Sequence, residues 1–328
     1  MISVRHGLAA AAGMLLFAGA AHSQGLADCL ATPTIFEGTT LAEVADAYFG
    51  DIDYRYAVLL ATNARAGGDF PFIANPNQLP VGKKLCVPAI TEAARLRNRF
   101  LTYINAVHAM ALPEPSERSD NLSPIDTSKP AIVVSWVRPS QAKDYQANVG
   151  RTIAASGDIW VTLVPKLREF CAGYVKGQGS DLAAITLRVE QRLGLPPQSA
   201  KTDFVELEVS DPGNPDNIFR PCASPDVTTK TCGLGPPKTC DPKAASAEQC
   251  HRHRDFFFGQ YYNSYGVSLP TEFPWTSLGY TFDWAWGPVG LNGKSSFRVY
   301  GESEYVIPKG ASITVKGVYS TAEYCGVK

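Results

Sequence analysis

Residues 34–88 read TIFEGTTLAEVADAYFGDIDYRYAVLLATNARAGGDFPFIANPNQLPVGKKLCVP, and this stretch decides the fold of the N-terminal part of the chain. Residues 35–38 predict a short strand and a turn. Gly50 and Asp51 end the helix that follows, and residues 54–63 predict a second helix. The first helix has apolar residues at i, i+3, i+4 and i+7, a spacing that predicts one buried face: Leu41, Val44, Ala45 and Tyr48.

The order of these pieces resembles the lysin motif (LysM), a βααβ module that binds N-acetylglucosamine-containing glycans. Asn63 closes the second helix where the family usually has Asn, and residues 75–88 are similar to the family's closing "NP…L…G…L.IP" pattern. Thr39 stands where the family usually has Asp, and residues 66–72 are an insertion close to the family's glycan groove. The resemblance implies a glycan-binding domain over residues 24–90.

The resemblance also implies the residues that would bind the glycan. In the family, the groove lies between the turn before the first helix and the loop after the second, where backbone groups bond the N-acetyl groups. The expected ligand is peptidoglycan or a chitin-like glycan. The alternative is a LysM fold that has lost its ligand and serves as a spacer. The corresponding positions here are Gly38, Thr39, Thr40, Leu41, Ala61, Thr62 and Asn63.

The first 23 residues have the layout of a secretory signal peptide. Arg5 and His6 precede an apolar run over residues 7–21, and Ala21 and Ser23 form a small-x-small cleavage site. The alternative is an N-terminal anchor helix, but the run is too short for a lasting membrane span. We therefore expect a periplasmic or secreted protein with no stable membrane span.

The charge balance bears on the partners. The chain has 30 basic and 31 acidic side chains, so no net field gathers nucleic acid or an anionic membrane surface. A neutral saccharide or an envelope protein partner fits this balance better. Neither G-x-S-x-G, H-E-x-x-H nor a phosphate-cradling loop occurs in the sequence, and we expect no cofactor.

The even number of cysteines predicts full pairing in an oxidising compartment. Cys29 and Cys86 bracket the LysM-like segment, and a βααβ fold brings its two ends together, so we expect these two to pair. A zinc site is the rival account, but no C-x-x-C occurs, and we expect no metal. The remaining cysteines allow many connectivities, which the sequence leaves open: Cys171, Cys222, Cys232, Cys240, Cys250 and Cys325.

The remainder of the chain predicts a second domain. Residues 91–111 predict a helix, and residues 112–130, rich in Pro and Ser, predict an extended linker that buries no core. Residues 131–328 predict a larger α+β domain with a mainly antiparallel sheet and a disulfide-stapled loop at 220–250. That loop either orders surface chain only or forms a binding loop.

Strand patterns open and close the second domain, so we expect strands from both ends to form one sheet. Strands are expected at residues 131–137, 159–164 and 204–209, the last with one solvent-exposed face, and a β pattern begins at 278. Helices are expected to begin near Pro165, near Ser180 as the cap, and at Ser246, which with Gln249 forms a capping box.

No residue pattern points clearly to catalysis. His251 and His253 lie on the predicted helix 246–265, where residues two apart point about 200° apart and cannot grip one metal ion, so both are expected on the surface. Glu169 and Glu190 are expected on solvated helix faces. The interpretation favours a non-catalytic binding protein with no catalytic residues. The alternative is a cell-wall hydrolase whose catalytic domain is residues 131–328.

Aromatic residues crowd two late segments, 256–265 and 275–286. Exposed rings at Trp275, Trp284 or Trp286 would indicate a second glycan platform, but core filling is the commoner use of such rings and is favoured here.

Overall fold

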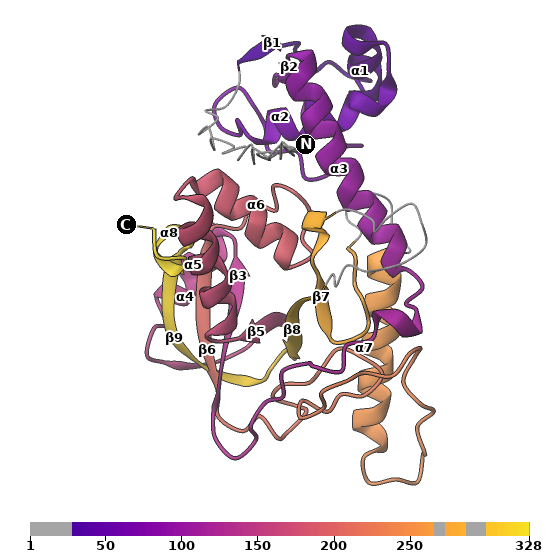
Figure 1. Ribbon diagram of the computed structural model, residues 1–328, viewed down its shortest axis with the longest axis vertical. Coiled ribbons are helices and arrows are strands. Elements are labelled where there is room, and N and C mark those ends of the chain that lie inside the picture. The colour runs from indigo at the N-terminus through magenta and orange to yellow at the C-terminus, as the bar shows by residue number, and fades with distance from the viewer. Residues whose placement is uncertain (1–27, 266–272, 287–299, 328) are drawn as a thin grey trace, which may run out of the picture.

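The computed structural model describes residues 28–265, 273–286 and 300–327, and Figure 1 shows a small N-terminal unit joined by a long helix to a larger part built on a sheet. The predicted signal peptide lies outside the described residues. Within the described residues, no helix is long and apolar enough to cross a membrane.

The N-terminal unit, residues 28–88, has the order strand, helix, helix, strand. A capping box between Thr40 and Glu43 begins its first helix, and Gly50, in the left-handed region at φ 68°, ends it. Tyr48 differs from the prediction, because it is 44% exposed and not part of the buried helix face. The elements are β1 (Cys29–Ala31), α1 (Leu41–Phe49), η1 (Ile52–Tyr54), α2 (Arg55–Asn63) and β2 (Val87–Pro88).

The helix α3 (Ile90–Met110) confirms the helix predicted at 91–111 and packs on α2. Its apolar face belongs to the same cluster as the core of the N-terminal unit. That cluster also includes Phe282 and Trp284 from the larger part, and the Trp284 ring lies 5.6 Å from that of Tyr103 on α3. The two parts are therefore joined by continuous apolar packing.

The larger part confirms an α+β fold with an antiparallel sheet. Among the described residues its strands follow the order β4-β9-β6-β3-β5-β8-β7, and every neighbouring pair is antiparallel. Strands from both ends of the segment meet in this one sheet, as predicted. They are β3 (Ala131–Val137), β4 (Thr152–Ala154), β5 (Ile159–Leu163), β6 (Asp203–Val209), β7 (Tyr280–Phe282), β8 (Tyr300–Ile307) and β9 (Ser312–Ser320).

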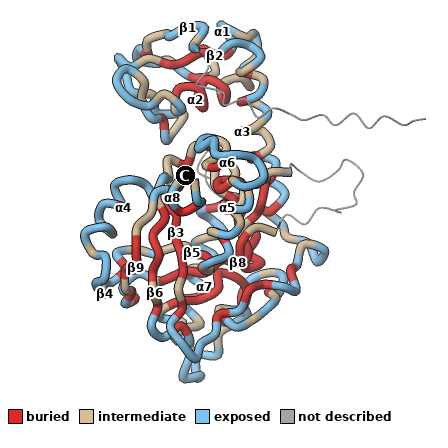
Figure 2. Tube along the Cα trace, turned by 60° about the vertical axis from the view of Figure 1, so that its left-hand side comes forward, coloured by how far each residue is buried: buried red, intermediate tan, exposed pale blue. Residues whose placement is uncertain are grey.

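Both faces of this sheet are covered, and Figure 2 shows the central strands buried along most of their length. On β6, Val205 and Leu207 point into a cluster that α4 helps to cover, whereas Phe204 points into a cluster beneath α5, α6 and α8. A further helix, α7, lies beyond β8 (Figure 1). The helices are α4 (Pro139–Gln146), α5 (Lys166–Gln178), α6 (Leu182–Arg192), α7 (Ala247–Tyr265) and α8 (Thr321–Tyr324), with short turns η2 (Pro115–Glu117) and η3 (Trp284–Trp286).

Two local predictions in this part are wrong. The face of β6 expected to meet solvent is covered, because α5 lies over it and Arg168 Nη2 donates to the buried Glu206 at 2.9 Å. The cap of α6 is Asp181, not Ser180, since the Asp181 carboxylate accepts from the backbone N–H of Ala183.

The segment 112–130 also differs from the predicted extended linker. Two of its residues, Leu122 and Ile125, are buried. Their backbone N–H groups donate to the carbonyl oxygens of Lys230 and Val227, at 2.9 and 3.0 Å. The Pro/Ser-rich composition did not predict this packing. Two apolar residues are enough to fix the segment when the loop at 227–230 provides a surface for them.

All eight cysteines lie within the described residues and are paired, which confirms the prediction of full pairing. Cys29 is joined to Cys86, as expected. Cys222–Cys232 and Cys240–Cys250 staple the loop predicted at 220–250, and Cys171–Cys325 ties α5 to the C-terminal end. Four disulfides fit a protein that folds in an oxidising, extracytoplasmic compartment.

Candidate functional site

The paired ends of the N-terminal unit hold its first turn in place. β1 and β2 are antiparallel, and Cys29 is paired with Pro88 beside the disulfide to Cys86. The backbone N–H of Ile35 donates to the Lys83 carbonyl at 2.7 Å, which continues this pairing toward the turn. The turn before α1 therefore projects from a cross-linked base.

Four predicted glycan-binding residues form that turn. Gly38 has φ 81°, a conformation that favours glycine, and it is exposed. Thr39 Oγ1 accepts from the backbone N–H of Phe36 at 3.0 Å, while Thr40 caps α1. Leu41 is buried in the core of the unit. The turn is thus shaped by its own hydroxyl groups and leaves its outer edge, at Gly38 and Thr40, open.

The other three predicted residues lie at the end of α2, and the side chains of Thr62 and Asn63 bond within the unit. Ala61 and Thr62 are buried. Thr62 Oγ1 donates to the Val58 carbonyl (2.7 Å) and accepts from the backbone N–H of Cys86 (2.9 Å). Asn63 Oδ1 accepts from the backbone N–H of Ile73, and its Nδ2 donates to the Ile73 carbonyl, so it holds the end of the 66–72 insertion.

The larger part reaches this end of α2, a contact that the sequence did not indicate. Gln198 Nε2 donates to the Leu60 carbonyl at 2.7 Å. Gln198 and Ala200 both have left-handed backbones, with φ 64° and 59°. Between them in sequence, the backbone N–H of Ser199 donates to the carboxylate of Glu190 on α6 at 2.7 Å. The half of the predicted groove at residues 61–63 therefore borders the larger part.

Two exposed apolar side chains next to the first turn were missed from the sequence. Phe36 is 69% exposed and Val81 is 66% exposed. They lie on adjoining segments, because the Gly82 N–H donates to the Ile35 carbonyl at 2.9 Å. The sequence did contain a signal for the exposed ring, because Phe36 directly precedes the Glu-Gly-Thr turn. An aromatic residue in such a turn does not fill the core.

The two histidines considered for metal binding lie in different environments. His251 is exposed, as predicted, but His253 is buried, which corrects the prediction that both are on the surface. His253 Nε2 bonds the Cys222 carbonyl at 2.8 Å, and burial lowers the pKa of His253. Across residues 28–265, 273–286 and 300–327, no three His, Cys, Asp or Glu residues gather at metal-binding distance.

The helical glutamates also differ from each other. Glu169 is exposed as expected, whereas Glu190 is buried, so the solvated-face interpretation of Glu190 is wrong. Burial raises the pKa of Glu190 to about 7, opposed by the backbone N–H groups that it accepts from and by Arg99 on α3. The helix period alone could not show this, because α3 and the 198–200 loop cover that face.

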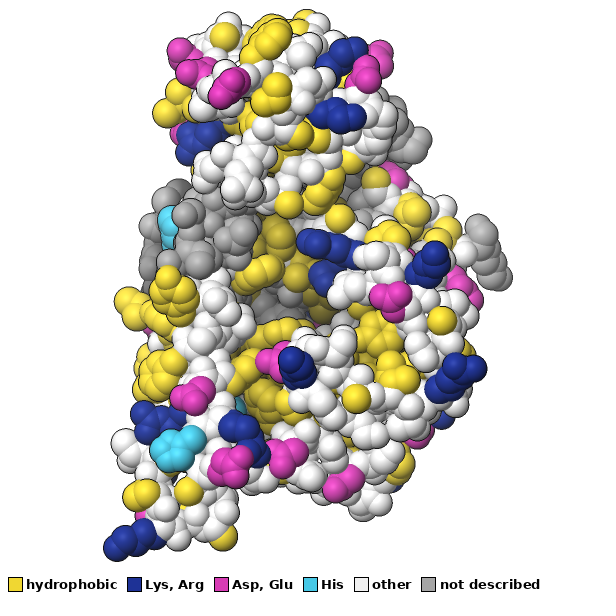
Figure 3. All heavy atoms as spheres, turned by 180° about the vertical axis from the view of Figure 1, so that it is seen from behind, with side chains coloured by type: hydrophobic (Ala, Val, Ile, Leu, Met, Phe, Trp, Pro, Cys, Tyr) yellow, Lys and Arg dark blue, Asp and Glu magenta, His cyan; other side chains and the backbone are white. Residues whose placement is uncertain are grey.

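The tryptophans fill the core. Trp275 and Trp284 are both buried, in agreement with the prediction of core filling, and nothing is described of the Trp286 side chain. On the face shown in Figure 3, basic and acidic side chains are interspersed, so that face shows no broad patch of one sign.

Comparison with protein-family models, curated proteins and solved structures finds no match to this chain. The class of protein therefore follows from the fold and its exposed groups alone. It is an α+β protein with four disulfides and a small βααβ unit packed onto its larger part.

Proposed function

We propose that this chain is a periplasmic or secreted binding protein for N-acetylglucosamine-containing glycans such as peptidoglycan or chitin-like chains. The ligand binds the N-terminal unit at the turn formed by residues 36–41, and the larger part serves as a structural or partner-binding module. The exposed ring of Phe36 beside this turn is the observation on which the proposal depends.

The chemistry of the turn supports a sugar ligand. The face of an aromatic ring carries partial negative charge, which attracts the weakly positive C–H groups on one face of a pyranose. Phe36 supplies such a ring, and Val81 extends its apolar surface. The exposed backbone at Gly38 lies next to the ring, where amide groups of a turn can bond an N-acetyl group.

The residues at the end of α2 contribute less to the proposed site than the first turn does. The side chains of Thr62 and Asn63 bond the unit itself and Ala61 is buried, so only backbone groups of these residues are left for a glycan. This arrangement concentrates the proposed contacts on the first turn.

The test is retention of the oxidised full-length protein on purified peptidoglycan and on chitin at low salt. We expect retention on at least one of the two, with elution by soluble N-acetylglucosamine oligomers. If neither retains a protein whose circular dichroism shows that it is folded, the spacer alternative holds and the proposal is rejected.

A further inference from the structure

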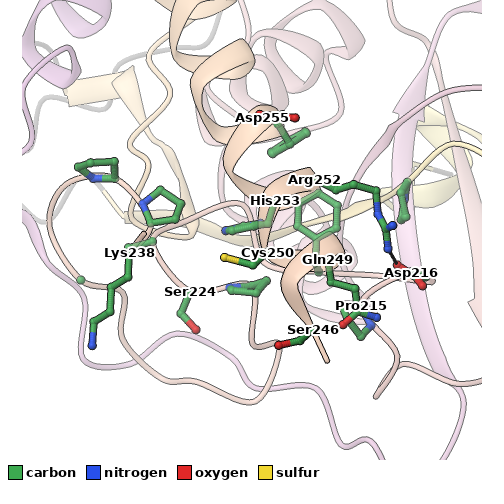
Figure 4. Close-up of a pocket in the computed structure, with 18 of the residues that line it drawn as sticks. Pro215, Asp216, Ser224, Lys238, Ser246, Gln249, Cys250, Arg252, His253 and Asp255 are labelled. Carbon is green, nitrogen blue, oxygen red and sulfur yellow. Dashed lines mark hydrogen bonds and ion pairs between the residues drawn. The ribbon is translucent and has the colours of Figure 1, made fainter. Parts of the chain in front are cut away.

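A hollow lies between α7 and the stapled loop (Figure 4). We call it the stapled pocket. Its volume is about 900 Å³, within the range of small-molecule sites. Gln249, His253 and Phe256 line it from α7 at i, i+4 and i+7, so they share one helix face. The opposite wall includes residues 233–234 and 236–239 of the stapled loop.

Three aromatic rings form an apolar floor. The Phe219 ring lies 5.5 Å from that of His253 and 4.9 Å from that of Phe256, at interplanar angles of 87° and 82°. Because Phe219 is perpendicular to both, the rings form a corner. A flat ligand ring can meet one ring face while contacting the edge of another.

His253 contributes a hydrogen-bond acceptor. A carbonyl oxygen only accepts, so the 2.8 Å bond to Cys222 places the proton on Nε2. The depressed pKa keeps the imidazole neutral at pH 7, which leaves Nδ1 as a lone pair. Nδ1 is buried and has no hydrogen-bond partner among the described residues. An unpaired buried acceptor is costly. Less than 1 Å² of Nδ1 is accessible, so a ligand O–H or N–H reaches it after a small rotation of the imidazole or of a neighbouring side chain, and the new bond then offsets that cost.

The rim of the stapled pocket carries no net charge. Its acidic residues, Asp158, Asp216 and Asp255, equal in number its basic residues, Lys238, Arg252 and Lys309. Arg252 Nη2 bonds Asp216 Oδ1 at 2.6 Å, which Figure 4 shows at the edge of the hollow. A charged ligand finds no complementary field here. A neutral ligand rich in hydroxyl groups finds both donors and acceptors.

The walls are covalently fixed. Cys222–Cys232 and Cys240–Cys250 close the loop, and Cys250 itself lines the pocket. Proline residues in the lining, such as Pro236 and Pro237, restrict the backbone further. A preformed wall reduces the ordering cost of binding.

We propose that the stapled pocket binds one ring of an uncharged oligosaccharide, with the apolar face of the sugar on Phe219 and Phe256 and a hydroxyl donating to His253 Nδ1. An apolar ring corner beneath a polar, charge-balanced rim matches a pyranose, which has an apolar face and a hydroxylated edge. This site goes beyond the proposed function and does not depend on the turn at Phe36. If both sites engage one glycan chain, their linkage raises overall affinity.

The test uses oxidised full-length protein with two uncharged probes, cellotetraose and N-acetylchitotetraose. Long-range ¹H–¹⁵N spectra of the imidazoles report the pocket directly, and a His253→Gln variant assigns the His253 signal. We expect one or both probes to shift His253 Nδ1 and to leave His251 unchanged. In calorimetry, His253→Gln, which keeps a donor toward Cys222 but removes the Nδ1 acceptor, weakens this binding about tenfold. Gln249→Ala is a second variant that leaves the ring corner intact and also weakens it.

His251→Gln is the matched control, because His251 lies on the same helix but is exposed and does not line the pocket. Phe36→Ser separates the two proposals, since it weakens binding at the first turn and leaves the His253 shift intact. The inference is overturned if neither probe shifts His253 at millimolar concentration. It is equally overturned if indole, an uncharged aromatic N–H donor, shifts His253 while both saccharides fail.

Discussion

The side-chain amide of Gln198 donates a 2.7 Å hydrogen bond to the backbone carbonyl oxygen of Leu60, and this bond joins the larger part of the chain to the end of α2. Replacing Gln198 by Ala removes it. We expect the free energy of unfolding to fall by about 1 kcal/mol, because the Leu60 carbonyl still accepts from Ala64. Hydrogen exchange should accelerate at residues 61–66. Gln178→Ala, an exposed glutamine, is the control and should change neither quantity.

Glu190 predicts a pH dependence of stability. Burial raises its folded-state pKa from an ordinary 4.5 to about 7, so between these values the native state binds more protons than the unfolded state. The stability that Glu190 contributes is therefore complete below pH 4.5 and is lost as pH rises through 7. In Glu190→Gln, which keeps the acceptor for Ser199, this loss should be absent.

Urea unfolding of the wild type and of Glu190→Gln at several pH values measures the effect. Glu304 is also buried with its pKa raised to about 8, but it is present in both proteins, so the difference between the two curves isolates Glu190. The exposed Glu169→Gln should give a curve parallel to the wild type. If the Glu190→Gln curve were also parallel to that of the wild type, Glu190 would not be the source of the pH dependence.

A buried ion-pair network on the inner side of α6 should be sensitive to the loss of one member. Asp283 accepts two bonds from Arg188, at 2.9 and 2.7 Å, and lies 3.6 Å from Arg192. Its side chain is 4% exposed. Arg192 keeps its 2.7 Å bond to Glu302, but Asp283→Ala removes the carboxylate that pairs with Arg188. This change should lower the free energy of unfolding by about 3–5 kcal/mol.

The contrasting pair on the surface is Arg252–Glu248, in which the Glu248 side chain is 87% exposed. Glu248→Ala should lower the free energy of unfolding far less than Asp283→Ala does, since solvent screens the pair. Chemical denaturation of both variants measures the difference. Equal losses for Asp283→Ala and Glu248→Ala would refute the idea that burial decides the effect.

The disulfides should differ in their contribution. Cys29 and Cys86 are 57 residues apart, whereas Cys240 and Cys250 are 10 apart. In the loop-entropy model, replacing the first pair by Ala should cost about 1.5 kcal/mol more than replacing the second. Thermal or urea unfolding of the two double variants tests this. A thiol-reactive label should not modify the native oxidised protein, and labelling of any cysteine would count against full pairing.

The proposed glycan contact predicts a specific loss. Phe36→Ser should weaken retention on the retaining glycan about tenfold, because it removes the exposed ring without disturbing the core. Tyr48→Ser is the matched control, since Tyr48 is an exposed aromatic residue at the opposite end of α1. Equal retention of Phe36→Ser and wild type would show that the turn is not the binding surface.

The sequence by itself determined the elements whose cause is local. The apolar spacing after Thr40 and the positive φ required at Gly50 determined α1. Apolar residues at helical spacing over 91–110 determined α3, and the alternation of apolar and acidic residues determined β6. The Cys29–Cys86 bond was also expected, because a recognisable βααβ segment lies between the two cysteines.

Only the tertiary structure decided which faces meet. The environments of Glu190 and His253 depend on α3, the 198–200 loop and Cys222, all remote in sequence or outside the helix concerned. The same holds for the strand order and for the partners of six cysteines. Periodicity tells which side of a helix is apolar, whereas the path of the rest of the chain decides what covers the polar side, and no local pattern carries that information.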